Sequence, residues 1–230
     1  MKHSIVAFIV ACLPTVASAQ VGHLPGESPF RDLNFRQEAT GFVGYFSAPD
    51  DPAGVAYRSG PLIGARYEVR IGGPAQFTAR VATVFSERRV IDPTESADTR
   101  FVRMESAPLH LADIGISVNL TGQKSWHGFV PIVHGGLGIA SDLETERDSG
   151  GYGFGTTFAL AFGTGVRWLP ADRWQLRADF ADYLYQVSYP DTYYQDPVGG
   201  GDPVLPAGQS KSFWTNNLTL TLGVSYHLFR

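Results

Sequence analysis

The sequence predicts an all-β chain that closes into an eight-stranded antiparallel up-and-down transmembrane β-barrel. The first of three observations is composition: of 230 residues, 26 are glycine, 13% are aromatic and only 17% are charged, a balance that favours strands over helices. The second is a series of segments in which apolar residues alternate with small or polar ones, the two-residue period of a strand with one apolar face. The third is the spacing of these segments, because long and short connections alternate.

The N-terminus has the features of a secretory signal peptide over residues 1–19. A short basic start and an apolar stretch precede Ala17-Ser18-Ala19, which fits a cleavage site and gives a mature start at Gln20. The only cysteine, Cys12, lies inside this segment, so the mature chain is expected to contain no disulfide. The residues before Cys12 also resemble a lipoprotein box, but the apolar run is short and a good cleavage site follows.

The mature chain divides into two parts. Residues 20–37 contain Pro, Gly and charged residues without a clear period, and we expect a lead-in there. Residues 38–230 form the expected barrel domain.

The first three strands follow from their alternation. Strand one begins at about Glu38 and includes Phe42 and Tyr45. The next two form the clearest hairpin, in which two alternating segments flank the turn Gly72-Gly73-Pro74.

The remaining five strands show the same pattern and lead to the last one, where every second residue from Leu218 to Leu228 is large and apolar. The expected strands cover about 38–47, 63–71, 76–85, 108–120, 128–140, 156–169, 174–187 and 214–230. The long connections between them are 48–59, 87–106, 141–155 and 188–211, and the short ones are 72–75, 121–127 and 170–173. Long external loops opposite short periplasmic turns are typical of outer-membrane barrels.

Alternation alone does not say which face points outward, since a soluble lipocalin-like barrel has its apolar face inside. Tryptophans favour the membrane arrangement, because Trp126, Trp168 and Trp174 all lie at the short-turn ends of strands, as an interfacial girdle requires. Trp214 lies near the long-loop end.

The less apolar face carries five basic and three acidic residues that are costly against lipid and tolerable in a lumen. This expected lumen charge network consists of Arg66, Glu68, Arg70, Arg80, Asp113, Arg167, Arg177 and Asp179. Within it, Glu68 is expected to form ion pairs with Arg66 and Arg70 on its own strand. Asp113 and Asp179 are the expected partners of Arg80 and Arg177. The lumen of an eight-stranded barrel is just wide enough for side chains to fill, so a packed interior is favoured over a conducting pore.

Two short motifs carry a resemblance to a known family. The end of the chain, with Gly223, Tyr226 and Leu228, resembles the signal that barrel-assembly machinery reads on a last strand, although Phe229 is followed by Arg230 rather than ending the chain. The run Val130–Gly138 resembles a Gly-rich strand common in small barrels. From about Glu38 onward the chain is therefore similar to the small outer-membrane β-barrel proteins of the OmpA-like/OmpX-like type. The resemblance implies an eight-stranded barrel in the outer membrane of a Gram-negative cell, without the peptidoglycan-binding domain of some relatives.

The fold does not fix a function. We expect a monomeric, non-enzymatic protein with a structural or surface-interaction role; the alternatives are a narrow porin-like channel and a soluble lipocalin-like carrier. The expected partners are outer-membrane lipid, lipopolysaccharide and the assembly machinery, without nucleic acid, since the net charge is −4.

No cofactor, metal site or catalytic site is predicted. Lipid-modifying enzymes share this barrel, and His110 with Asp113, or His134, are candidates for their catalytic roles, but neither lies in a motif of those enzymes. The acidic loop Asp142–Asp148 departs from the spacing of a calcium loop.

Overall fold

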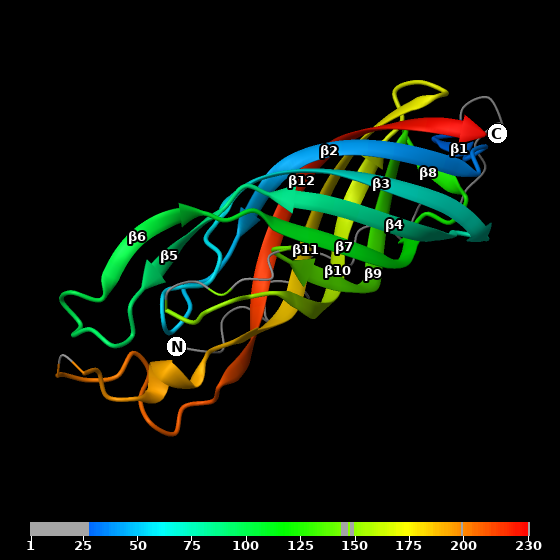
Figure 1. Ribbon diagram of the computed structural model, residues 1–230. Coiled ribbons are helices and arrows are strands. Elements are labelled where there is room, and N and C mark those ends of the chain that lie inside the picture. The colour runs from blue at the N-terminus through cyan, green and yellow to red at the C-terminus, as the bar shows by residue number, and fades with distance from the viewer. Residues whose placement is uncertain (1–27, 144–146, 148–149, 199, 230) are drawn as a thin grey trace, which may run out of the picture.

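The computed structural model describes residues 28–143, 147, 150–198 and 200–229. The expected signal peptide lies outside these residues. Eight antiparallel strands form a closed barrel (Figure 1). They are β2 (Gln37–Ser47), β3 (Gly60–Gly72), β4 (Ala75–Val84), β7 (Leu109–Asn119), β9 (Phe129–Ser141), β10 (Thr156–Trp168), β11 (Trp174–Ser188) and β12 (Ser212–Phe229).

The last strand closes the barrel against the first. β12 pairs with β2 from Leu218 opposite Ser47 to Tyr226 opposite Ala39, with an irregularity beyond His227. All other neighbours in the ring are also antiparallel, with β7 paired to β9. The predicted fold class is confirmed, and no strand of the ring is left with an unpaired edge.

The apolar face of the strands points outward. Ile63, Tyr67 and Leu220 are exposed, and Leu160 is half-buried on the same face of its strand. An outward apolar band is the arrangement for a barrel surrounded by lipid. It argues against a carrier that holds an apolar ligand inside.

Exposed tryptophans lie at both rims. At the short-turn rim, Trp126 and Trp168 both pair with Phe129, and Trp174 pairs with Tyr226, so these three lie near one height. Trp214 is exposed on β12 toward the long-loop rim. The described residues include no helix long and apolar enough to cross a membrane.

The lead-in and the short turn after β7 are more ordered than the sequence indicated. β1 (Phe30–Asp32) pairs with β8 (Lys124–Trp126) beside the short-turn end of the barrel. The lead-in continues into the barrel mouth, where Leu33 and Phe35 are buried. Three-residue strands are too short to show a period, which explains why the pattern missed them.

The polar stretch predicted as a loop over 87–106 also contains strands. β5 (Glu87–Ile91) and β6 (Phe101–Ser106) form a two-stranded hairpin that extends away from the barrel at the end opposite β1 and β8 (Figure 1). Charged residues on β5 and β6 obscure the alternation. The last long loop contains one turn of 3₁₀ helix, η1 (Asp191–Tyr194).

Candidate functional site

Eight buried charged side chains occupy the centre of the lumen, four acidic and four basic. They come from six strands of the ring: Glu38, Arg66, Glu68, Arg80, Asp113, Arg167, Arg177 and Asp179. A buried charge must be compensated by an opposite charge. Because the positive and negative charges of this set balance, no counterion from solvent is needed.

One half of this lumen charge network is centred on Glu68. Its carboxylate accepts a hydrogen bond of 3.0 Å from Arg167 and a shorter one from Arg177. Arg167 also lies 3.4 Å from Glu38 and donates to Gln76. Glu38 in turn accepts a hydrogen bond of 2.7 Å from Gln175. These contacts cross the lumen from β10 and β11 to β2, β3 and β4.

The other half joins two aspartates to the remaining arginines. Asp179 lies 2.9 Å from both Arg66 and Arg177, which links the halves. Asp113 lies 2.9 Å from Arg80 and accepts a hydrogen bond of 2.8 Å from the Tyr183 hydroxyl. The Arg80 guanidinium also lies over the Tyr183 ring, 4.8 Å from its centroid.

The structure places seven of the eight predicted network residues in the centre of the lumen, and the eighth, Arg70, lies farther along β3 at the mouth of the barrel. This arginine is half-buried at the short-turn end, where it donates a hydrogen bond of 2.8 Å to the Leu33 carbonyl. Among the described residues, no ion pair within 4.0 Å joins Glu68 to Arg66 or to Arg70. Glu68 instead meets Arg167 and Arg177 across the narrow lumen, whereas the ion pair that does form between residues two apart on one strand is Arg177–Asp179 at 2.9 Å.

Sequence reasoning missed Glu38 as a network member. It lies at the start of β2 and is fully buried, with Thr40 and Phe42 on the same inward face. The sequence pattern could have identified Glu38, because the alternation of inward and outward residues on this strand extends back to it. Its position beside the irregular lead-in made the strand start uncertain.

An apolar layer closes the short-turn end. Leu33 and Phe35 from the lead-in pack with Val130, Ile132 and Leu169. The Phe35 ring also stacks on His227 at 4.0 Å and lies under the Arg70 guanidinium. The lead-in is therefore a plug in this mouth of the barrel.

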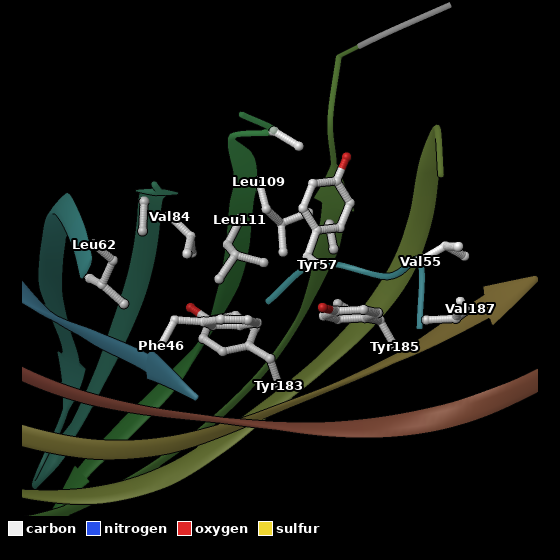
Figure 2. Packing of buried hydrophobic residues seen from close by; sticks show 14 of the residues in the cluster. Phe46, Val55, Tyr57, Leu62, Val84, Leu109, Leu111, Tyr183, Tyr185 and Val187 are labelled. Atoms are coloured by element: carbon white, nitrogen blue, oxygen red, sulfur yellow. The ribbon is translucent and has the colours of Figure 1, made fainter. Parts of the chain in front are cut away.

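A larger apolar cluster closes the long-loop end. Inward residues of the strands meet residues of the loops, as Figure 2 shows. Among its buried members are Phe46, Val55, Tyr57, Leu62, Val84, Leu109, Leu111, Tyr183, Tyr185 and Val187. The lumen charge network thus lies between two apolar layers.

Hydrogen bonds to carboxylates hold the outer loops together. Tyr189 donates to Asp51 at 2.6 Å and Tyr57 donates to Asp142 at 3.1 Å, which ties the first loop to the third and fourth. Asp51 also accepts a backbone hydrogen bond of 3.0 Å from Ala56. Burial and the adjacent carboxylate raise the pKa of both tyrosines well above the ordinary value.

The histidines considered for catalysis, His110 and His134, lie on β7 and β9 of the ring. His134 lies 4.0 Å from Asp179, and its register partner is Ser117 on β7, yet no hydrogen bond joins the histidine to that serine. Both side chains are enclosed in the lumen. His110 contacts Thr83 at 3.0 Å. No group of three metal-ligating side chains occurs in the described part of the chain.

The acidic loop and the chain end are only partly described. Asp142 is buried and accepts a hydrogen bond of 3.2 Å from the Gly155 backbone, whereas Glu144, Glu146 and Asp148 lie outside the described residues. On β12, Gly223 pairs with Phe42, Tyr226 accepts a hydrogen bond of 3.0 Å from Arg173, and Leu228 is exposed.

Together these features define the fold of a small outer-membrane-type β-barrel, with an apolar outer band, aromatic rims and a filled lumen. Among solved structures the chain is similar to the outer membrane protein OprG from Pseudomonas aeruginosa, with a TM-score of 0.53 and 10% identity over 87% of this chain and 98% of that one. It also aligns with the N-terminal β-barrel domain of Pseudomonas aeruginosa OprF (TM-score 0.48, 10% identity, 84% and 97% covered). A third alignment is with Neisserial surface protein A (TM-score 0.46, 14% identity, 87% and 98% covered).

No protein-family model and no curated protein matches the sequence. The likeness to OprG confirms the fold that the sequence resemblance implied. At such low identity it carries no functional assignment.

Proposed function

We propose that this protein is a non-enzymatic outer-membrane barrel that acts through its outer loops as a surface-interaction protein. Its location there is supported by the outward apolar band and by the fold it shares with an outer-membrane protein. The signal peptide expected at residues 1–19 would supply the export route.

The observation that carries the proposal is the filled lumen. A balanced network of buried ion pairs occupies the middle, and apolar layers occupy both ends. An ion crossing this lumen would have to displace salt bridges such as Glu68–Arg167 and then pass a dry apolar layer. This supports a closed barrel over the porin-like alternative.

The outer end supports a role in interaction. β6 exposes Phe101, Val102 and Met104 on the hairpin that extends beyond one end of the barrel. Grouped apolar side chains on a projecting surface are typical of interaction sites. The tyrosine–aspartate contacts between loops keep this end ordered, so a partner would meet a preformed surface.

The partners expected during assembly and residence remain part of the proposal. Outer-membrane lipid and lipopolysaccharide would cover the apolar band between the tryptophan rims. Barrel-assembly machinery would recognise the last strand through Gly223, Tyr226 and Leu228. A monomer suffices, since the barrel has no open edge in its ring.

Planar-bilayer recording of the purified protein tests the closed lumen. The wild type should give no steady current, whereas Glu68→Ala should leak and change its heat-modified gel mobility, because it removes the carboxylate that lies nearest to both Arg167 and Arg177. A stable wild-type current would favour the channel alternative. No change in either property of the variant would reject the packed-lumen argument at this residue.

Labelling of intact cells tests the location and orientation. A Val102→Cys variant should react with a membrane-impermeant maleimide, and a Gln123→Cys variant, exposed at the short-turn end, should not. Protein recovered entirely in the soluble fraction after detergent-free lysis would reject the membrane location.

A further inference from the structure

A partly open cavity of about 690 Å³ lies at the long-loop end of β2, β3 and β4. Its lower wall includes a row of side chains across the three strands: Tyr45 pairs with Pro61, and Phe85 donates a backbone hydrogen bond of 2.8 Å to the Pro61 carbonyl. Tyr45 and Phe85 are each more than half exposed on the outer face. Exposed aromatics at the end of an apolar band mark the level of lipid headgroups.

The upper wall carries both signs of charge. Arg58 and Arg89 line the cavity together with Asp50 and Glu87. Among the described residues, none of these four forms an ion pair within 4.0 Å. Asp51 differs, because its carboxylate is engaged by loop backbone groups and by Tyr189. The cavity therefore presents two cations and two anions that do not neutralise each other directly.

An apolar groove of about 660 Å³ begins directly below this cavity on the outer wall. Val43 pairs with Ile63, and both point outward two residues below Tyr45 and Pro61. The groove continues over Gly41 toward Leu222 and Leu176. A charged cavity at headgroup level and an apolar groove beneath it match the two parts of a lipid.

We propose that cavity and groove together bind one lipid whose headgroup carries both a phosphate and a primary amine, as phosphoethanolamine does. Arg58 and Arg89 supply N–H donors for the phosphate oxygens. Asp50 and Glu87 accept hydrogen bonds from the ammonium group, and the acyl chains lie along the groove over Gly41. This inference rests on the proposed membrane location, which the fractionation experiment tests separately, and it is independent of whether the lumen conducts.

Native mass spectrometry of the full chain in non-ionic detergent, with added dioleoyl lipids, tests the site. One equivalent of phosphatidylethanolamine should be retained about tenfold more tightly than phosphatidylglycerol, which lacks the amine, or phosphatidylcholine, which has no N–H donor. The double variants Arg58→Gln/Arg89→Gln and Asp50→Asn/Glu87→Gln should each lose this preference. The control Arg103→Gln changes an exposed arginine on β6 that lies outside the cavity and should keep it.

Two further measurements distinguish the contribution of the headgroup to binding from that of the acyl chains. Gly41→Leu should weaken retention about tenfold by filling the groove, since a Cβ there meets open space and the fold tolerates it. Free O-phosphoethanolamine should bind far more weakly than the lipid. Equal retention of the three lipids, or unchanged retention in both double variants that still show the folded gel mobility, overturns the proposal. Equal binding of the free headgroup overturns the part played by the groove.

Discussion

Replacement of Arg167 by methionine is the sharpest test of the lumen charge network. Arg167 is fully buried, and its guanidinium contacts the carboxylates of Glu68 at 3.0 Å and Glu38 at 3.4 Å as well as the Gln76 amide. Methionine retains the apolar stem and removes the charge. The network then holds three cations and four anions.

The expected loss follows from that imbalance. Breaking a buried ion pair by removing one partner costs about 3–5 kcal/mol of unfolding free energy, because the other charge stays buried and unpaired. Arg177 still contacts Glu68, so we expect a value near the lower limit. The double variant Arg167→Met/Glu38→Gln restores the balance of charges and should recover about half of the loss or more.

Urea unfolding in lipid vesicles, followed by tryptophan fluorescence and by heat-modified gel mobility, measures both variants. The single variant should unfold at clearly lower urea, and the double variant should lie between it and the wild type. A single variant with the wild-type midpoint would refute the argument that these charges are dry and mutually compensated. If the single variant does not fold, the double variant decides whether charge balance is the cause. The argument then requires that the double variant, in which the balance is restored, folds.

Phe35→Ala should lower the unfolding free energy by about 3 kcal/mol, since it removes a buried ring from the plug; an unchanged urea midpoint would show that the lead-in does not seal the mouth. Burial beside carboxylates raises the pKa of Tyr57 and Tyr189, so their contribution to loop stability is complete below about pH 10 and is lost as the pH rises through the raised values. Tyr57→Phe should accordingly leave the phenolate absorbance between about pH 9 and about pH 11 unchanged, and a decrease would mean that this hydroxyl titrates normally. Val102→Lys should shift the unfolding free energy by less than about 0.5 kcal/mol because the side chain is exposed on β6; a larger fall would show that it packs in the folded chain.

The sequence by itself determined the ring of eight strands and the face that each presents. A two-residue period fixes which side chains share a face, and it needs only neighbours along the chain, so Leu218–Leu228 revealed its outward face directly. The alternation of connection lengths and the positions of Trp168 and Trp174 then placed the two rims. The same two-residue period predicted that the charged residues of the network, from Arg66 to Asp179, point inward.

Only the tertiary structure decided which charges meet. The partners of Glu68 come from β10 and β11, about 100 residues away along the chain; a contact across a lumen depends on barrel closure and register, which no local pattern encodes. The plug and the projecting hairpin depended on tertiary context too. Leu33 and Phe35 are buried because Val130, Ile132 and His227 offer them an apolar surface from distant parts of the chain, which no local sequence period encodes.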